Sequence, residues 1–210
     1  MSRAVILANG VPPRADTLAH ALEGATLFVC ADGGANTARA AGVVPHAIVG
    51  DLDSAERATL AHFASVEQVR DPAPDRTDTE KAIEWILARG AWDEITLLGA
   101  SAGRLDHVLA NLSLLRRYAG RVSLVLEDDH ARSWLARGVV ALDVPVGTTV
   151  SFFAVGGPAE GVTTENFRYA LRDVRMDLGA QDSISNITTG RPARIRIARG
   201  ELLVFVVTRP

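Results

Sequence analysis

The sequence predicts an α/β domain with a doubly wound, mostly parallel sheet and helices on both faces, followed by a small antiparallel β-sandwich domain. Over the first 126 residues, short apolar runs alternate with longer amphipathic segments, which is typical of a parallel sheet covered by helices. After residue 127 the helical periodicity stops, and short β-rich segments alternate with glycine and proline. We therefore expect an α/β domain over residues 1–126, a connection over 127–137 and a β-sandwich over 138–210.

Five strands of the first part are near-continuous apolar runs, the pattern of strands that are buried on both faces, and a weaker run over residues 66–69 indicates a sixth strand. They are expected over residues 4–8, 27–30, 47–49, 66–69, 95–98 and 122–126. Helical periodicity lies between them, over residues 15–23, 34–42, 55–64, 78–89 and 105–118. The repeated order of strand and helix indicates a parallel sheet.

The second part contains short β-rich segments only. Strands are expected over residues 139–142, 149–154, 194–197 and 202–207. Residues 198–201 have the composition of a turn, so we expect the last two strands to form a hairpin.

Composition excludes several classes of protein. The 210 residues are 48% hydrophobic and 22% charged, which is typical of a globular protein and not of a disordered one. A formal net charge of -3 gives no general attraction to nucleic acid or anionic membranes, and the single Cys30 excludes a disulfide framework. No apolar run has the length of a membrane span, and Ala4–Ala8 is too short for a signal-peptide core. We expect a cytoplasmic protein with neither nucleic acid nor membrane as a partner.

The residues able to carry chemistry follow the predicted strands. Ligands of an open parallel sheet bind outside the carboxyl ends of its strands, where the strand-to-helix turns converge. Four of these turns carry acids, glycines or an arginine, namely residues 31–36, 50–54, 71–81 and 99–107. The sequence therefore predicts one polar site at this edge of the sheet.

Two of these turns are rich in carboxylates. Asp51 and Asp53 would repel each other unless a cation such as Mg²⁺ lay between them, although Asp53 or Ser54 could instead cap the next helix. Thr77-Asp78-Thr79-Glu80 has the form of a capping box, with Thr77 at the N-cap and the Glu80 side chain reaching back. Asp78 then lies in the first helical turn, where the helix dipole favours an anion with or without a metal.

Positive charge and flexible backbone come from other residues near these turns. Lys81, the only lysine of the chain, either pairs with Asp78 or contacts a phosphate. In residues 99–107 the glycines allow backbone N–H groups to approach a phosphate, and Arg104 can bind phosphate oxygens through two N–H groups. Asp106 can join the metal cluster, whereas His107 and Asn111 are either ligand contacts or structural residues.

Common signatures of other sites are missing. No Gly-x-Gly-x-x-Gly follows the first strand, and no Gly-x-x-x-x-Gly-Lys-Ser/Thr occurs, which argues against NAD-type and P-loop sites. No Gly-x-Ser-x-Gly occurs, and Cys30 lies in a predicted buried strand, so we expect no hydrolase nucleophile.

Five motifs occur in order along nearly the whole chain. They are Asp32-Gly33-Gly34-Ala35-Asn36, Gly50-Asp51-Leu52-Asp53-Ser54, Thr77-Asp78-x-x-Lys81, Gly103-Arg104-Leu105-Asp106-His107 and Ser185-Asn186. Together they resemble the thiamine pyrophosphokinase family. The resemblance implies a Mg²⁺-dependent transferase that moves the pyrophosphoryl group of ATP to thiamine, giving thiamine diphosphate and AMP. It also implies a homodimer with thiamine bound between subunits.

The resemblance also implies roles for particular residues. Asp51, Asp53 and Asp78 would hold Mg²⁺, Arg104 and Asp106 would complete the catalytic set, and Ser185 and Asn186 would face thiamine. The other candidate contacts to nucleotide and substrate are Asp32, Gly33, Asn36, Asp75, Arg76, Thr77, Lys81, His107 and Asn111. Residues 72–76 depart from the family, which often has a lysine or glutamine there, and Ala102 replaces the first glycine of a Gly-Gly-Arg motif.

Some questions stay open at the level of sequence. One alternative function is a pyrophosphokinase for another small alcohol such as a hydroxymethylpterin, and another is an ATP-sensing module without catalysis. Thiamine is a cation that suits an aromatic pocket, and the aromatic residues nearest the second-domain motifs are Trp134, Phe167 and Tyr169. Core packing is expected for Phe167. The sequence identifies no general base.

Overall fold

A computed structural model describes residues 2–208, so Met1 of the first expected domain and residues 209–210 of the second lie outside it. The chain divides into two compact units, with the boundary between Asp129 and His130. This boundary falls within the expected connection, residues 127–137. Each unit has its own strands and its own core and is described by itself.

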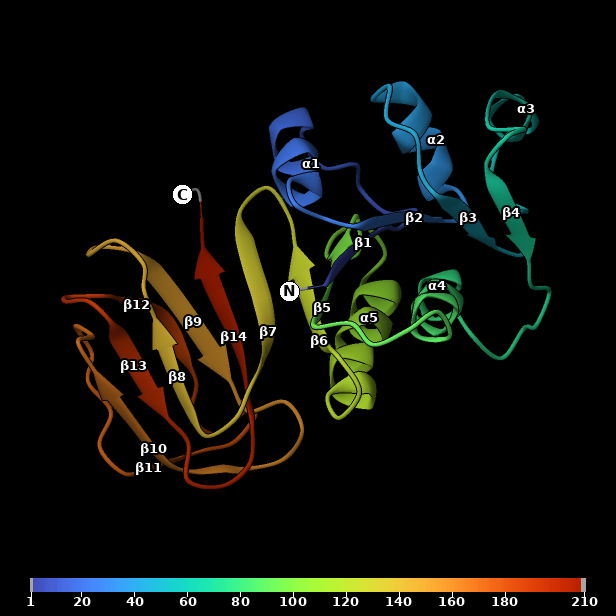
Figure 1. Ribbon diagram of the computed structural model, residues 1–210. Coiled ribbons are helices and arrows are strands. Elements are labelled where there is room, and N and C mark those ends of the chain that lie inside the picture. Colours follow the sequence, from blue (N-terminus) through green and yellow to red (C-terminus); the bar gives the residue numbers. More distant parts are fainter. Residues whose placement is uncertain (1, 209–210) are drawn as a thin grey trace. The chain divides into compact units, whose positions relative to one another are not determined.

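The first unit is built on six parallel strands (Figure 1). These are β1 (Arg3–Leu7), β2 (Leu27–Ala31), β3 (Ala47–Gly50), β4 (Glu67–Arg70), β5 (Glu94–Leu98) and β6 (Ser123–Glu127). Their order in the sheet is β6-β5-β1-β2-β3-β4. Every strand expected before residue 127 is present, and the parallel α/β fold is confirmed. The long apolar runs identified these strands because β1, β2 and β3 are almost wholly buried.

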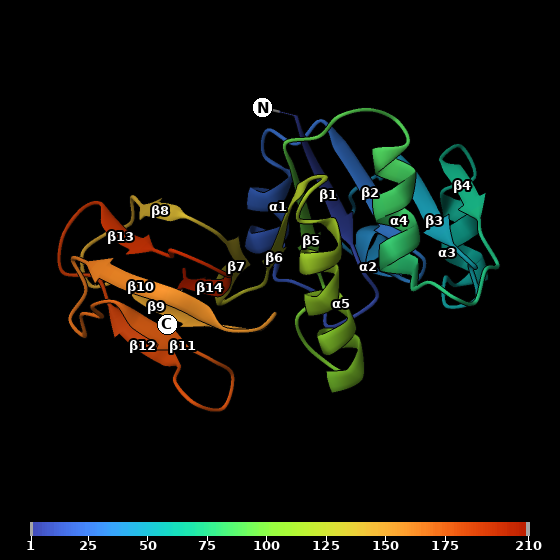
Figure 2. The ribbon, with the colours of Figure 1, turned by 90° about the horizontal axis from the view of Figure 1, so that it is seen from below.

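Five helices cover the two faces of this sheet. They are α1 (Ala15–Leu22), α2 (Gly34–Ala40), α3 (Arg57–His62), α4 (Asp78–Leu87) and α5 (Leu105–Tyr118). Helices α1, α2 and α3 lie on one face, and α4 and α5 lie on the other (Figures 1 and 2). All five helices were expected, but α1, α2, α3 and α4 are shorter than their patterns suggested. Helix α2 stops at Ala40 because Gly42 adopts a φ of +68°, a left-handed conformation that ends helices.

The strand order places a ligand-binding edge beside β1. Strands β2 and β5 lie on opposite sides of β1, so the winding of the chain reverses there. The turns that follow these strands diverge at such a switch point and leave space between them. No helix among residues 2–208 is long and apolar enough to cross a membrane.

The second unit consists of two antiparallel sheets. Strands β7 (Ala131–Ala136), β9 (Thr149–Phe153), β12 (Ser183–Ile187) and β14 (Leu202–Val207) form one, in the order β12-β9-β14-β7. Strands β8 (Val139–Leu142), β10 (Ala159–Glu165), β11 (Val174–Met176) and β13 (Ala193–Arg196) form the other, in the order β11-β10-β13-β8. Phe152 and Val204 of the first sheet share a buried core with Val162 and Ile195 of the second, which confirms the sandwich.

Strands β10, β11 and β12 were not expected, and two further details differ from expectation. Residues 131–136, which were expected within the connection, form β7. The expected hairpin at residues 198–201 is wrong, because β13 and β14 belong to different sheets. Residue Arg199 instead forms a bridge with Glu160, and a Cβ on Gly200 would lie 2.4 Å from the Pro158 carbonyl oxygen, so this turn packs against the start of β10.

Candidate active site

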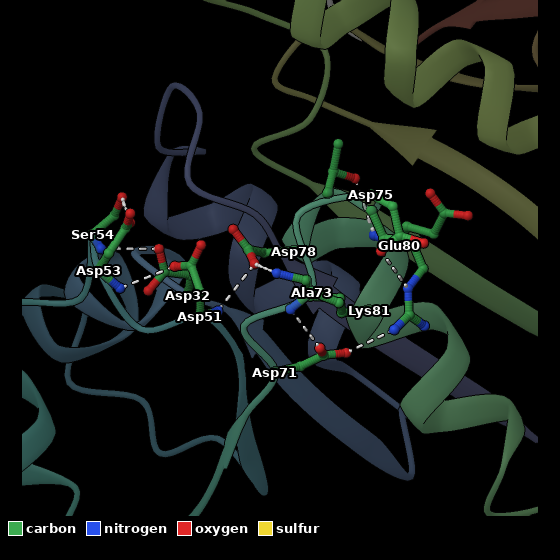
Figure 3. Close-up of polar contacts among 12 residues, drawn as sticks. Asp32, Asp51, Asp53, Ser54, Asp71, Ala73, Asp75, Asp78, Glu80 and Lys81 are labelled. Atoms are coloured by element: carbon green, nitrogen blue, oxygen red, sulfur yellow. Dashed lines mark hydrogen bonds and ion pairs between the residues drawn. The ribbon is translucent and has the colours of Figure 1, made fainter.

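Three carboxylates from separate turns meet at the carboxyl edge of the parallel sheet (Figure 3). Asp32 follows β2, Asp51 follows β3, and Asp78 is the first residue of α4. One carboxylate oxygen from each lies within 4.8 Å of the other two. A side chain at Gly50 would fill this space, because its Cβ would lie 3.0 Å from Asp78 Oδ1. The glycine before Asp51 therefore allows the three acids to approach.

Asp32 is held in this group by the turn that follows β3. Its side chain is buried, and its two oxygens accept hydrogen bonds from the backbone N–H groups of Ser54 and Ala55, each at 3.1 Å. Burial raises the pKa of Asp32, and the charge of Asp78 raises it further, whereas the two N–H donors oppose both effects. Asp32 was expected as a contact to nucleotide or substrate and not as a metal ligand, so its place among the three carboxylates was missed.

Asp78 is positioned by the start of α4. The hydroxyl of Thr77 accepts a hydrogen bond from the backbone N–H of Glu80 at 3.3 Å, which confirms Thr77 as the N-cap. The expected return of Glu80 to the N-cap is wrong. Its carboxylate instead accepts hydrogen bonds from two residues of α5, the Tyr118 hydroxyl and the Arg117 guanidinium, and the guanidinium is charged and therefore a stronger donor than a backbone N–H.

Lys81 lies beneath the acidic group. Its side chain is only 3% exposed, and its ammonium donates a hydrogen bond of 2.9 Å to Asp78 Oδ1 (Figure 3). The backbone N–H of Asp51 donates to the same oxygen at 3.2 Å. Of the two roles considered from the sequence, the structure shows the ion pair with Asp78.

The other acids considered for the site lie outside this group of three. Asp53 is exposed, accepts from the Ser54 hydroxyl at 2.9 Å and donates its N–H to Asp51. Asp106 pairs with Arg104 through two contacts, of 2.6 Å and 3.1 Å, at the start of α5. Hydrogen bonding to Arg104 lowers the pKa of Asp106 to about 2.

A pocket of about 660 Å³ opens at the switch point beside β1, and it includes two of the three carboxylates. Of the candidate residues, those that line it are Asp32, Thr77, Asp78, Gly103, Arg104, His107 and Asn111. Residues 8–12 after β1 and residues 99–104 after β5 form much of the remaining wall. The turn after β1 was considered from the sequence only for its lack of a dinucleotide motif, so its part in the pocket was missed.

The two turns on either side of the switch point pack closely together. A Cβ on Gly10 would lie 2.1 Å from the Gly99 carbonyl oxygen, so only glycine fits there. Asn111 donates to the Ala100 carbonyl at 2.8 Å, and the Ser101 hydroxyl donates to Asp128 at 2.7 Å. Asn111 thus shapes the turn after β5 through its side-chain amide.

Four further candidates lie near the pocket without lining it. Gly33 packs against Asn9, where a Cβ would lie 2.4 Å from the side chain. Asn36 bridges the Ser54 carbonyl and the Glu56 N–H, each at 3.0 Å. Arg76 pairs with Asp71 at 3.0 Å, and Asp75 is largely exposed. The two remaining candidates, Ser185 and Asn186, do not belong to this unit and lie in β12 of the second unit.

The donor set of the acidic group fits a hard divalent cation. Asp32, Asp51 and Asp78 offer carboxylate oxygens only, with no imidazole or thiolate, and Mg²⁺ prefers oxygen ligands and keeps positions for phosphate oxygens. The first turn of α4 and the exposed Arg104 border the same pocket and favour anions. The arrangement is therefore suited to hold a polyphosphate together with its cation.

Comparison with known proteins agrees with this geometry. Residues 18–126 match the family model described as "Thiamin pyrophosphokinase, catalytic domain", and residues 139–202 match "Thiamin pyrophosphokinase, vitamin B1 binding domain". The chain is 28% identical over 189 residues to the thiamine pyrophosphokinase of Bacillus subtilis, covering 86% of each chain. It is also 28% identical over 220 residues to thiamine pyrophosphokinase 1 of Oryza sativa, covering 91% of this chain and 82% of the other.

Solved structures share the fold over the full chain. The thiamin pyrophosphokinase of Candida albicans superposes with a TM-score of 0.89 at 17% identity, covering 98% of this chain and 88% of the other. The Bacillus subtilis enzyme superposes with a TM-score of 0.85 at 23% identity, covering 100% of both chains. Because the two family models match both units of the chain, in the order of the sequence, the chain belongs to the thiamine pyrophosphokinase family.

Proposed function

We propose that this chain transfers the diphosphoryl group of ATP to the hydroxyl of thiamine, giving thiamine diphosphate and AMP, and that Asp32, Asp51 and Asp78 hold Mg²⁺ for the reaction. The observation that carries the residue assignment is the convergence of these three carboxylates, of which Asp32 and Asp78 line a pocket of about 660 Å³. Family membership supports the reaction.

Under this proposal, each of the two units binds one of the substrates. The first unit would bind ATP, since its pocket lies at the switch point of a parallel sheet. The second unit would bind thiamine, which is supported by its match to a vitamin B1 binding domain. We further propose a homodimer, as the family resemblance implies, and a location in the cytoplasm, as expected from the sequence.

Catalysis of phosphoryl transfer depends mainly on positioning and on neutralising charge. Mg²⁺, when bound, would offset negative charge on the phosphate oxygens. Thr77 and Lys81 hold Asp78 at the start of α4, and the 51–55 turn holds Asp32. Arg104, which is exposed at the pocket, would stabilise charge on the leaving phosphate once it exchanges Asp106 for the nucleotide.

No side chain is assigned as a general base. Phosphoryl transfer through a loose transition state needs little removal of the proton from the attacking hydroxyl before the bond to phosphorus forms. The residues of this site accordingly act by holding the phosphates, the cation and the acceptor in line.

The test is mass detection of thiamine diphosphate and AMP after mixing the purified chain with thiamine, ATP and Mg²⁺. Asp51→Asn and Asp78→Asn should lose most of kcat while staying folded, and Glu67→Gln, which changes a surface carboxylate of β4, should leave kcat unchanged. AMP release with a hydroxymethylpterin but not with thiamine would support the other pyrophosphokinase. ATP binding without AMP release from either alcohol would support a sensing module, and either result would overturn the proposal.

Comparing Asp53→Asn with Asp32→Asn distinguishes two possible sets of metal ligands. The family resemblance includes Asp53 among the ligands, whereas the described geometry puts Asp32 with Asp51 and Asp78. If Asp32 is the ligand, Asp32→Asn should weaken Mn²⁺ binding, measured by electron paramagnetic resonance, more than Asp53→Asn does. The reverse order would assign the site to Asp53.

A further inference from the structure

The carboxylates of the acidic group accept hydrogen bonds from the protein, and these bonds decide which oxygens remain for a cation. Each carboxylate oxygen has two lone pairs. The two oxygens of Asp32 accept one backbone N–H each, and Asp51 Oδ1 accepts the N–H of Asp53 at 3.1 Å. These backbone bonds leave each oxygen of Asp32 and Asp51 a lone pair that can bind a cation.

One oxygen of Asp78 differs, because two donors share it (Figure 3). Asp78 Oδ1 accepts from the Lys81 ammonium at 2.9 Å and from the Asp51 N–H at 3.2 Å. Two accepted bonds use both lone pairs of this oxygen. Within residues 2–208, Asp78 Oδ2 accepts no hydrogen bond, so Oδ2 is the oxygen through which Asp78 can bind a cation.

Burial keeps the Lys81 ammonium on Asp78. The side chain of Lys81 is 3% exposed, and α4, which carries it, packs against β2 and β3. Because an unpaired charge is costly to bury, the ammonium cannot leave Asp78 unless α4 moves. The bond to Oδ1 therefore persists when a cation approaches Oδ2, whereas an exposed lysine would turn away into water.

Divalent cations differ in how they use a carboxylate. Mg²⁺ takes about six oxygen ligands in a strict octahedron, whereas Ca²⁺ takes about six to eight and often binds both oxygens of one carboxylate. One oxygen from each of the three acids leaves positions of an octahedron for phosphate oxygens and water. Binding of Ca²⁺ to both oxygens of Asp78 would require Oδ1 to give up the Lys81 ammonium.

We propose that Lys81 selects the cation of this site, because it restricts Asp78 to one coordinating oxygen and so favours Mg²⁺ over Ca²⁺. The inference rests on the proposed Mg²⁺ site and deepens it, with Lys81 as a positioning residue that acts through Asp78. The selection serves the reaction, because in-line transfer depends on precise placement of the phosphates and Ca²⁺ holds its ligands in a more variable geometry.

Competition for bound Mn²⁺, followed by electron paramagnetic resonance of the whole chain without nucleotide, tests the selection. In wild type, Mg²⁺ should displace Mn²⁺ at lower concentrations than Ca²⁺ does. Lys81→Met removes a positive charge, which should tighten the binding of both ions alike, and it frees Oδ1, which should tighten the binding of Ca²⁺ alone. The preference for Mg²⁺ over Ca²⁺ should therefore fall about tenfold in the variant.

Arg89→Met is the matched control, because Arg89 also has an ion pair of 2.9 Å, with Glu67 and away from the acidic group. It should leave the displacement by both ions as in wild type. Equal tightening of Mg²⁺ and Ca²⁺ in Lys81→Met would show that Lys81 acts through its charge alone and would overturn the selection. If Lys81→Met does not fold, wild type still decides, because displacement by Ca²⁺ as effective as that by Mg²⁺ excludes the selection.

The results separate this inference from the function on which it rests. A wild-type chain that makes thiamine diphosphate, together with a Lys81→Met variant of unchanged preference between the two ions, overturns only the selection. A wild-type chain that makes no thiamine diphosphate overturns the proposed reaction, whereas the displacement of Mn²⁺ needs no turnover and still decides the selection. A wild-type chain that binds no Mn²⁺ overturns both the metal assignment and the selection.

Discussion

Replacing Lys81 tests how the acidic group is stabilised before any cation binds. Lys81→Met keeps the length of the buried side chain and removes its charge, so the paired oxygen of Asp78 loses its ammonium donor at 2.9 Å. Two unit charges at this distance attract by about 6 kcal/mol at an effective dielectric constant of about 20. Two effects reduce the contribution of this attraction to stability. Burying the ammonium costs free energy, and the Asp78 side chain, which is 30% exposed, regains water in the variant. We expect a net loss of about 3 kcal/mol in the free energy of unfolding.

A matched control has the same ion-pair distance without the burial. Arg89 and Glu67 are also 2.9 Å apart, but their side chains are 40% and 53% exposed, so Arg89→Met should cost less than about 1 kcal/mol. Urea unfolding followed by ellipticity at 222 nm is the assay. It reports the first unit, because every helix of the described residues lies there.

The response to Mg²⁺ distinguishes charge from packing. A divalent cation at the three carboxylates would replace the missing positive charge, so millimolar Mg²⁺ should restore more stability to Lys81→Met than it adds to wild type or Arg89→Met. The reasoning is refuted if Lys81→Met is as stable as Arg89→Met without Mg²⁺, or if Mg²⁺ stabilises all three proteins equally.

Three further predictions concern the supports of the site. Thr77→Ala removes the cap of α4 and should lower the free energy of unfolding by about 1 kcal/mol, whereas Thr77→Ser should not, and equal urea midpoints would contradict the cap. Hydrogen bonding to Arg121 lowers the pKa of Glu84 below its ordinary value of 4.5, so this carboxylate stabilises the fold above pH 4.5 and ceases to as the pH falls through the lowered value. Glu84→Gln should therefore be less stable than wild type at pH 7, by a margin that shrinks as the pH falls below 4.5, and a pH-independent difference in urea unfolding would exclude the ion pair as the cause. Gly10→Ala should force apart the turns after β1 and β5 and raise the KM for ATP several-fold with little change in that for thiamine, so an unchanged ATP KM would show that these turns do not shape the nucleotide site.

The sequence predicted elements best where burial is two-sided. Five strands of the first unit, β1, β2, β3, β5 and β6, are short apolar runs between amphipathic helices. The mostly exposed and polar β4 gives a weaker signal, yet all six strands were expected within one residue of their bounds. Strands β10 and β12 of the second unit were missed because they carry polar or glycine residues at most positions, and β11 was missed because its three residues are too few to show a pattern. The segment Ser183–Ile187, for example, buries only Ser183 and Asn186 and shows no apolar alternation. Its position depends on pairing with β9 and on the Asn186 hydrogen bonds, which are contacts between distant parts of the chain.

For the site, the sequence indicated the right edge of the sheet. The rule that ligands bind at the carboxyl ends of parallel strands needs only the positions of the strands along the chain, and it predicts that Asp51 and Asp78 meet. The pairing of Lys81 with Asp78 was one of two alternatives, and local spacing could not choose between them. The choice depends on the burial of the lysine, which α4 acquires only by packing against β2 and β3.

The grouping of Asp32 with Asp51 and Asp78 shows why spacing alone is insufficient in a turn. In an extended chain, residues two apart point to the same side, which is the basis for pairing Asp51 with Asp53. Leu52 lies between them with a φ of +65°, so the chain turns sharply and this periodicity does not apply. The turn points backbone N–H groups toward the three carboxylates. Those of Ser54 and Ala55 donate hydrogen bonds to Asp32 and hold it in place. In this motif of two aspartates, the first, Asp51, thus places its carboxylate in the group. The residues that follow the second, Asp53, hold the carboxylate of Asp32, which comes from the end of the neighbouring strand.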